Sequence, residues 1–246
     1  MVSYYIVPIS ETELRQQIIE AGRRLYLRGF VAANDGNISA RLGNGLILTT
    51  PTGISKGFMR EEDLAVTDSD GNMISGPAKP SSEIKMHLLI YRTRPDINAV
   101  VHAHPPHATG FAAAGRHLND PIIAEPVVTL GDIPLAPYGT PGTTELTESL
   151  EPFILKNDAV LMANHGAVTY AASVEKALFM MESLEHYAAI TLVTDIIGRK
   201  SFISPENMEK LRVIRQAASG ASAQPGEERL AEIIADEIIK FRQEKS

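Results

Sequence analysis

The spacing of apolar residues predicts a helix near the start of the chain. Ser10 and Glu13 form a capping box, in which a hydroxyl and an acid satisfy the free N–H groups of a first helical turn. Apolar residues follow at roughly helical spacing, at Leu14, Ile18, Leu25 and Tyr26. The pattern stops near Gly29, where we expect the helix to end.

Farther along, short apolar runs between glycine, asparagine and proline predict strands that alternate with helices. Two hairpins are expected, one turning at Gly43–Gly45 and one around Asp68–Asn72, because glycine and asparagine favour tight turns. Further strands are predicted at residues 97–104, 122–130, 133–136 and 159–163, with one more after residue 166. Helices are predicted at residues 82–92, 108–114 and 174–197, and around residues 146–150. This mixture is typical of a layered α/β domain.

The end of the chain has a different character. We expect a main domain over residues 1–200 and a helical tail over residues 201–246. The sequence Gly220–Gly226 predicts a flexible link within the tail. An amphipathic helix is predicted beyond it, with an apolar face formed by Leu230, Ile233, Ile234 and Ile238. That face needs a partner, which is either the core or a neighbouring subunit.

Composition narrows the classes of function. The chain has 246 residues, of which 44% are hydrophobic and 22% charged, an ordinary balance for one large globular domain. The formal net charge of -7 argues against a nucleic-acid partner, because phosphate backbones attract basic patches. There are no cysteines, so histidines must carry any transition-metal site. No apolar run is long enough for a bilayer and no signal peptide is apparent, so we expect a soluble, cytoplasmic protein without membrane contact.

Two histidines stand at the end of a predicted strand. His102 and His104 are two residues apart, and because successive strand side chains alternate between faces, both imidazoles lie on one face. Zinc binds imidazole nitrogen at about 2.0–2.1 Å, and two ligands from one rigid strand need little ordering. This pair is therefore a candidate metal site.

A third histidine completes the candidate site. His165 follows the strand at 159–163 and precedes Gly166, where functional side chains commonly emerge from loops. Three histidines leave an open coordination position, which is typical of catalytic zinc. His107 is the alternative third ligand, but the two prolines before it should aim it away from the strand's face. The remaining histidines are expected to be ordinary helix or loop residues: His87, His117 and His186.

An acid and a set of polar residues add to the histidines. Glu83 falls in the first turn of a predicted helix, where an acid stabilises the helix dipole by about 0.3–1 kcal/mol. Beside a metal, the same carboxylate can act as a base toward a proton next to a carbonyl group. Five residues offer amide, hydroxyl or backbone N–H donors that suit a phosphate, although turns use the same residue types: Asn37, Thr52, Gly53, Ser81 and Ser82.

Taken in order, these motifs resemble the class II (zinc) aldolase family typified by L-fuculose-1-phosphate aldolase. The resemblance extends over most of the chain, to about residue 198. The segments that carry it are Gly36–Ser39, Thr50–Ile54, Pro80–Glu83, Val100–His104, Ile133–Tyr138, Asn164–Gly166 and Glu175–Ala177.

The resemblance implies a fold, a metal and a reaction. The fold is a three-layer α/β/α sandwich with a central, mainly antiparallel sheet, making residues 1–200 a catalytic domain that assembles as a homotetramer with sites near subunit interfaces. One Zn²⁺ per subunit, replaceable by Mn²⁺ or Co²⁺, is assigned to His102, His104 and His165. Glu83 becomes the catalytic acid/base, and the substrate phosphate is assigned to Asn37, Thr52, Gly53, Ser81 and Ser82. The implied reaction reversibly cleaves a ketose 1-phosphate into dihydroxyacetone phosphate and an aldehyde.

The chain departs from the family pattern on the aldehyde side. Family members place an interface tyrosine near the segment that reads Ile123–Pro126, which contains none. Glu125 is the candidate to replace it as proton donor. The family's C-terminal aromatic is also changed, since the last tyrosine is Tyr187 and Phe241 is the late aromatic of the tail. The dihydroxyacetone phosphate half of the site is therefore better supported than the aldehyde half.

Other functions on the same fold remain open. Cleavage of 5-deoxyribulose or methylthioribulose phosphates would be a variant of the aldolase reaction. Pentulose-5-phosphate 4-epimerases need an additional acid/base set, and metal-dependent decarboxylases should favour arginines for a carboxylate substrate. Adducin-like interaction modules, which are not enzymes, lack the complete histidine triad that this chain has.

Overall fold

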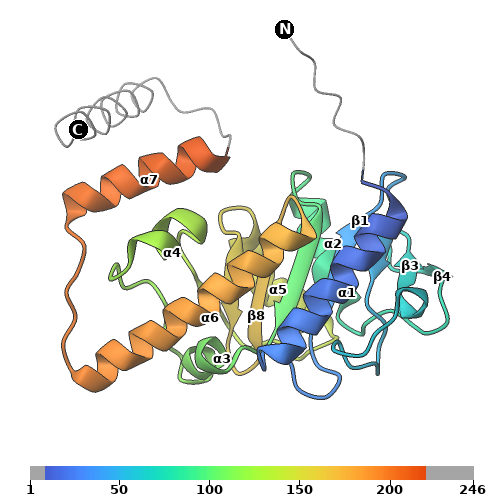
Figure 1. Ribbon diagram of the computed structural model, residues 1–246, viewed down its shortest axis with the longest axis horizontal. Coiled ribbons are helices and arrows are strands. Elements are labelled where there is room, and N and C mark those ends of the chain that lie inside the picture. The colour runs from blue at the N-terminus through green and yellow to red at the C-terminus, as the bar shows by residue number, and fades with distance from the viewer. Residues whose placement is uncertain (1–8, 220–246) are drawn as a thin grey trace, which may run out of the picture.

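The computed structural model describes residues 9–219, which form a sheet covered by helices on both faces (Figure 1). Its eight strands lie in the order β4-β3-β2-β1-β5-β8-β7-β6. Their bounds are β1 Asn37–Arg41, β2 Ile47–Thr49, β3 Ala65–Thr67, β4 Met73–Ser75, β5 Ala99–Ala103, β6 Leu135–Ala136, β7 Ala159–Met162 and β8 Gly166–Ala171. Neighbouring strands are antiparallel except β6 and β7, which are parallel. Both predicted hairpins are confirmed, as β1–β2 and β3–β4.

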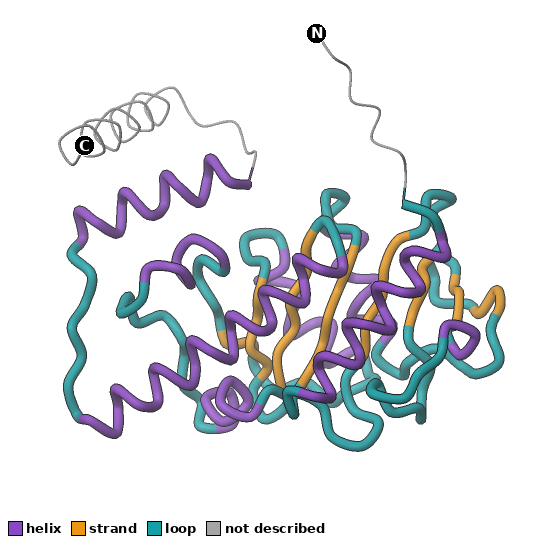
Figure 2. Tube along the Cα trace, viewed as in Figure 1, coloured by secondary structure: helices purple, strands orange, loops and turns teal. Residues whose placement is uncertain are grey.

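The helices form the outer layers. One face is covered by α1 Glu11–Leu27, α3 Pro106–Ala113 and α6 Val174–Ile197, and the other by α2 Ile84–Thr93 and α5 Thr144–Ile154. In Figure 2, α1 and α6 cross in front of the strands. The capping box of Ser10 and Glu13 begins α1 as predicted. A three-layer α/β/α sandwich with a mainly antiparallel sheet is thus confirmed.

The strand alternation decides which side chains meet α2. In β1, Ile38 and Ala40 join the core under α1 and α6. Asn37 and Ser39 therefore point toward the α2 face, because neighbouring strand residues point to opposite faces. In β5, Val101 belongs to the core under α1 and α6, so His102 shares the α2 face with Asn37, its partner across the β1–β5 ladder.

One predicted strand is wrong. Residues 122–130 contain no strand but a short helix, α4 Ala124–Thr129. The β-branched composition favours a strand, but Pro126 cannot donate to a sheet ladder, whereas a proline is tolerated in the first helical turn. The carbonyl of Pro126 then accepts hydrogen bonds from Leu130 and Gly131, which closes the turn.

Part of the tail is also helical. The helix α7 Pro205–Ser219 packs against α4, and the 3-10 turn η1 Glu61–Asp63 completes the regular elements. The predicted link at 220–226, the helix around Leu230–Ile238 and Phe241 lie outside the described residues. Among residues 9–219, no helix is both long and apolar enough to cross a membrane.

Candidate active site

Three imidazoles converge at one edge of the sheet. His102 is the second-last residue of β5, His104 follows the strand, and His165 lies in the turn between β7 and β8. The ring centroids are 4.9 Å apart for His102 and His104, 4.8 Å for His102 and His165, and 5.3 Å for His104 and His165. One nitrogen from each ring lies within 4.8 Å of the others, a spacing that could hold a metal ion.

The turn that carries His165 is shaped by its neighbours. Asn164 has a φ of 56°, in the left-handed region that asparagine tolerates better than most residues. At Gly166, an added Cβ would lie 2.5 Å from Cδ2 of His104 and 2.6 Å from the carbonyl oxygen of Ala103. A glycine is therefore required here for His104 and the end of β5 to approach this closely.

The donor atoms fit a cation. His102 Nδ1 lies 2.8 Å from the carbonyl oxygen of Ala167, so it carries the proton and leaves Nε2 with a lone pair directed into the cluster. That Nε2 lies 3.2 Å from Nε2 of His104, and two lone pairs facing each other this closely need a proton or a metal between them. A carbonyl that fixes the tautomer of a histidine is also the usual support of a metal ligand.

Glu83 joins the histidines from the first turn of α2. It occupies the N-cap position, but its side chain makes no capping hydrogen bond. Its Oε2 lies 3.3 Å from His102 Nε2 and accepts a 2.8 Å hydrogen bond from Asn37 Nδ2. Its Oε1 lies 3.2 Å from His165 Nε2 but is buried without a hydrogen bond. The carboxylate is thus directed at the cluster and not at its own helix.

Burial and charge act in opposite directions on Glu83. Burial raises the pKa of its carboxyl group, whereas the attraction of His102 and His165 lowers it by more, so the pKa lies well below its usual range. A lowered pKa favours the ionised carboxylate, which is the state that a general base requires. The pKa of His104 falls to about 4 because the ring is buried and lies beside two other histidines.

A polar pocket of about 290 Å³ opens beside Glu83, and we call it the histidine pocket. Its walls include Asn37, Thr52, Gly53, Ser81, Ser82, Glu83, His104 and His165. The two loops that supply the hydroxyls are joined by backbone hydrogen bonds from Thr52 to Lys79 and from Ser81 to Thr50. The structure therefore places all five residues predicted for phosphate around one pocket, with His102 buried behind it.

Asn37 differs from the other four. Its side-chain amide is already bonded on both sides, through Nδ2 to Glu83 and through Oδ1 to His87 Nε2 at 2.5 Å. Only 2% of the residue is exposed. Its geometry therefore links it to the acid/base, while its contact with phosphate stays a prediction.

Two residues that line or support the pocket were not predicted from the sequence. His87, expected to be an ordinary helix residue, is 1% exposed and fully hydrogen-bonded behind Asn37. Lys56 is 2% exposed, lines the pocket and donates from Nζ to the carbonyl oxygens of Asn34 and Ile54, each at 2.9 Å. The position of Lys56, shortly after Thr52 and Gly53, could have indicated that it belongs to the pocket.

Two other candidates lie apart from the histidine pocket. His107 places Nδ1 2.7 Å from Oε1 of Glu185 on α6, which also accepts its backbone N–H. His107 is thus part of the support for α3, in keeping with its lower rank as a ligand. Glu125 lies on α4 and is not among the residues lining the pocket.

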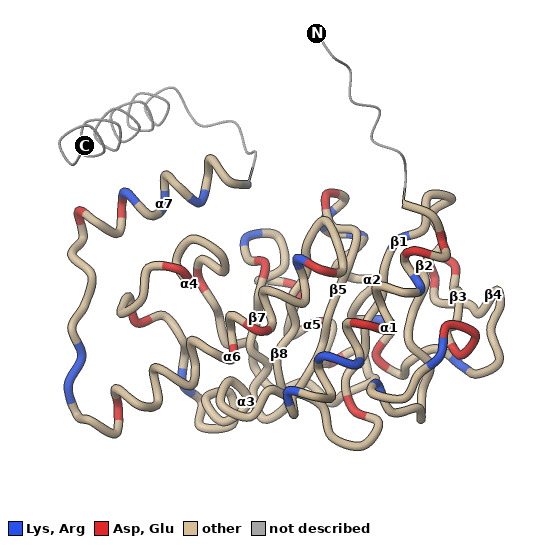
Figure 3. Tube along the Cα trace, viewed as in Figure 1, with Lys and Arg blue, Asp and Glu red and all other residues tan. Residues whose placement is uncertain are grey.

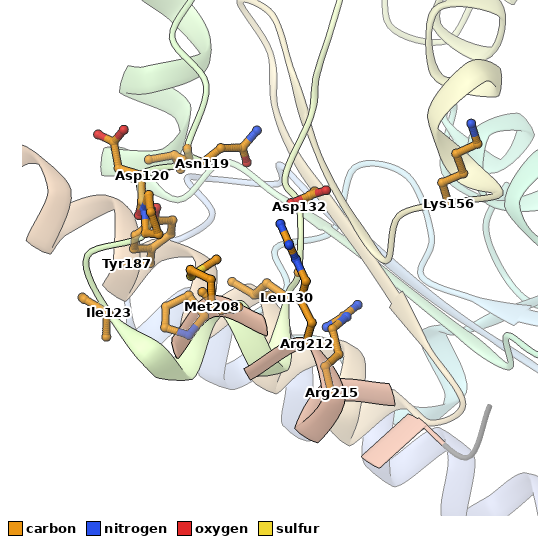
Figure 4. Close-up of a pocket in the computed structure, with 15 residues that line it drawn as sticks. Asn119, Asp120, Ile123, Leu130, Asp132, Lys156, Tyr187, Met208, Arg212 and Arg215 are labelled. Atoms are coloured by element: carbon orange, nitrogen blue, oxygen red, sulfur yellow. The ribbon is translucent and has the colours of Figure 1, made fainter. Parts of the chain in front are cut away.

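A second cavity, of about 200 Å³, lies between α4, α6 and α7, and we call it the α4–α7 cavity. Figure 4 shows Arg212 and Arg215 projecting from α7 toward the loop that carries Asp132. Arg215 donates to the backbone of Val128 at 2.9 Å and to the carboxylate of Asp158 at 2.7 Å. Acidic and basic residues are interspersed along α7 (Figure 3). This cavity shares no lining residue with the histidine pocket, and Arg215 ties α7 to α4 and to the residue before β7.

Comparison with known proteins gives a consistent result. The Class II Aldolase and Adducin N-terminal domain family matches residues 16–192. The chain is 35% identical over 199 residues to a 5-deoxy-D-ribulose 1-phosphate aldolase of Bacillus thuringiensis, covering 80% of this chain and 92% of that protein. It is 34% identical over 187 residues to a 3-oxo-tetronate 4-phosphate decarboxylase of Escherichia coli, covering 74% and 88%. A solved L-fuculose 1-phosphate aldolase superposes with a TM-score of 0.76 and 32% identity, covering 83% of this chain and 96% of that one.

Proposed function

Since the chain belongs to the Class II Aldolase and Adducin N-terminal domain family and is a lyase of the class II aldolase type, we propose that it reversibly cleaves a ketose 1-phosphate, such as L-fuculose 1-phosphate, into dihydroxyacetone phosphate and an aldehyde. One observation carries the proposal. The Glu83 carboxylate lies 3.2–3.3 Å from two imidazoles of the histidine triad, on the wall of a polar pocket. A base beside a metal is the arrangement that proton removal next to a carbonyl requires.

The metal proposed for the triad is Zn²⁺, with Mn²⁺ or Co²⁺ as substitutes. His102, His104 and His165 would hold it, because three neutral imidazoles suit zinc and leave an open coordination position. When bound, the ion supplies Lewis-acid stabilisation of the negative charge that develops beside the carbonyl group.

Glu83 would move the proton. Its Oε2 is occupied by the Asn37 amide, whereas Oε1 is buried and has no hydrogen bond. Oε1 is therefore the atom that takes the proton from the hydroxymethyl carbon in the direction of bond formation. In cleavage, the same oxygen returns the proton to that carbon, as microscopic reversibility requires.

The phosphate would bind in the same pocket. Ser81 and Ser82 stand just before Glu83, the N-cap of α2, where free backbone N–H groups and the helix dipole favour an anion. Thr52 and Gly53 face them across the paired loops. Asn37 also lines the pocket and is assigned to the same phosphate site.

A neutral aldehyde product agrees better with the pocket than a carboxylate substrate. Among the described residues lining it, Lys56 is the one lysine or arginine, and its ammonium group is already bonded to two backbone carbonyls. A carboxylate is usually recognised by an arginine fork. The decarboxylase reaction of the Escherichia coli relative is therefore the second candidate, supported by the similarity to that protein. A 4-epimerase and an adducin-like module rank below it.

The assembly proposed is a cytoplasmic homotetramer with sites near subunit interfaces, in which the tail of residues 201–246 covers the catalytic domain of residues 1–200 or a neighbour. Support comes from apolar side chains at the end of α6, where Ile196 is 76% exposed and Ile197 is 68% exposed. Such a patch commonly marks a contact with another protein surface. Light scattering during size-exclusion chromatography would measure the mass of the particle.

The reaction is tested by incubating the zinc-loaded protein with a panel of ketose 1-phosphates and following dihydroxyacetone phosphate. Release that is abolished in His104→Ala and Glu83→Ala is the expected result, and it would also identify the aldehyde. No release from any member by zinc-loaded protein would overturn the aldolase proposal. Release of carbon dioxide from a 3-oxo acid phosphate would instead establish the decarboxylase.

A further inference from the structure

A line of buried polar side chains leads away from Glu83 between α2 and β1. Glu83, His87 and Tyr91 follow at intervals of four residues, so they lie along one face of α2. Asn37 and Ser39 are two residues apart in β1 and face α2 from the sheet. The four residues behind Glu83 are 0–3% exposed. Polar groups buried this deeply are costly unless every member has a hydrogen-bond partner.

Each neighbouring pair in this line is within hydrogen-bond distance. Asn37 Nδ2 lies 2.8 Å from Glu83 Oε2, and Asn37 Oδ1 lies 2.5 Å from His87 Nε2. His87 Nδ1 lies 2.6 Å from Ser39 Oγ. Ser39 Oγ lies 2.8 Å from the hydroxyl of Tyr91. The line is therefore continuous from Tyr91 to the carboxylate.

The orientation of the Asn37 amide sets the direction of every hydrogen bond. Its Nδ2 donates to Glu83 Oε2, so its oxygen, which can only accept, faces His87. His87 must then donate from Nε2 and accept at Nδ1, which makes Ser39 the donor to His87. The hydroxyl of Ser39 has thereby used its proton, so Tyr91 donates to Ser39. Burial lowers the pKa of His87 to about 3, so the ring stays neutral and keeps this single tautomer.

We propose that His87, backed by Ser39 and Tyr91, is a positioning residue that locks the Asn37 amide and thereby fixes the rotamer of the Glu83 carboxylate. With Oε2 held by Asn37, Oε1 stays directed at the pocket, where the proton is transferred. The kinetic consequence rests on the proposed function, because it concerns the acid/base step. Side chains that hold a reacting group in place commonly change activity by about 10–100-fold when they are removed.

Nuclear magnetic resonance tests the direction of the chain without any substrate. In protein labelled with ¹⁵N at histidine, His87 should show a protonated Nε2 and an unprotonated Nδ1. The carboxyl carbon resonance of Glu83 should shift in His87→Leu, which removes both the donor and the acceptor, and stay near its wild-type position in His87→Gln, whose amide offers both. A proton on Nδ1, or an unmoved Glu83 resonance in His87→Leu, would overturn the inference.

Kinetics test the consequence. His87→Leu should lower kcat by about 10–100-fold with KM and zinc content unchanged, and His87→Gln should restore most of kcat. Tyr91→Phe, at the far end of the line, should lower kcat by less than threefold. Equal kcat losses in the Leu and Gln variants would show a packing effect and overturn the inference. If His87→Leu does not fold, Ser39→Ala removes the donor to His87 with little change in volume and takes its place. If wild-type protein cleaves no ketose phosphate, the proposed function fails, while the magnetic resonance result still decides the positioning chain.

Discussion

The histidine pocket and the α4–α7 cavity are of similar size, about 290 and 200 Å³, but they treat polar groups in opposite ways. In the α4–α7 cavity, Arg215 is paired with Asp158, and Asp120 is paired with Lys200 at 2.5 Å. In the histidine pocket, Glu83 Oε1 and His165 Nδ1 are buried without a hydrogen bond. Groups of the same kind also converge there, since three imidazoles face one another.

This difference indicates that the polar groups of the α4–α7 cavity stabilise the fold, whereas those of the histidine pocket take part in chemistry. Buried polar atoms are nearly always satisfied in folded proteins, so an orphaned carboxylate oxygen beside facing imidazoles indicates that a ligand completes the site. Among the described residues that line the α4–α7 cavity, no buried polar side-chain atom lacks a hydrogen bond, and Arg215 holds α7 in place. The two regions should therefore respond differently to metal removal, to loss of the acid and to loss of a charge pair.

Metal removal should have the largest effect and act on the histidine pocket alone. A chelator is expected to abolish dihydroxyacetone phosphate release, and added zinc should restore it, because the triad's lone pairs then lose their cation. The Tm should also fall, since a ligand that binds only the folded state stabilises it. Release that survives complete removal of the metal, as measured by elemental analysis, would contradict the proposed role of the triad.

Replacing the acid Glu83 should have the second-largest effect. Glu83→Gln can still accept the hydrogen bond from Asn37 but cannot take a proton, so kcat is expected to fall by about 10²–10⁴-fold. KM should change little, because the residues proposed for phosphate are untouched. Zinc content measured on the same sample is the control, since lost metal would mimic a lost base. A kcat within tenfold of wild type would assign the proton transfer to another group.

Much of the fold follows from local patterns. The capping box at Ser10 and the two hairpins were predictable because turn and cap chemistry is read over a few residues. The helix at Ala124–Thr129 was not, because its β-branched residues favour a strand and packing against α7 competes with that preference. Contacts with a distant segment cannot be read from a short window.

The residues of the candidate site likewise fall into those that local sequence patterns predict and those that only the fold reveals. The shared face of His102 and His104 follows from strand alternation, and the structure brings His165 to them across the β5–β8 and β7–β8 ladders. His87 was missed because its role depends on β1 lying under α2, although the four-residue spacing from Glu83 was present in the sequence. Lys56 was missed because only the fold shows that its charge is buried.

Lys56 of the histidine pocket should make the stability of the protein depend on pH. Burial lowers its pKa from the ordinary value of 10.5 to about 8, although Asp35 opposes this shift. Between these two values the unfolded chain binds a proton that the folded chain does not, so the free energy of unfolding should rise with pH across this window. The full difference corresponds to about 3 kcal/mol.

Urea unfolding at several pH values from 7.5 to 10.5 checks this sign, with Lys56→Met as the matched variant. The stability of wild type relative to Lys56→Met should increase as pH rises through about 8 and level off near 10.5. Changes common to both proteins come from other groups and cancel in the difference. A constant difference between the two proteins would mean that Lys56 keeps its ordinary pKa.

The smallest effect is expected from the α4–α7 cavity, where two arginines of one helix provide their own control. Arg215 is 26% exposed and donates to both Asp158 and Val128, whereas Arg212 is 61% exposed and reaches Glu209 at 3.4 Å. Arg215→Ala should therefore lower the free energy of unfolding by about 1–2 kcal/mol, and Arg212→Ala by less than about 0.5 kcal/mol. Neither should change kcat, because the cavity shares no lining residue with the histidine pocket. If Arg215→Ala lowers kcat in a protein that remains folded and zinc-loaded, α7 supports catalysis and the separation between the two regions fails.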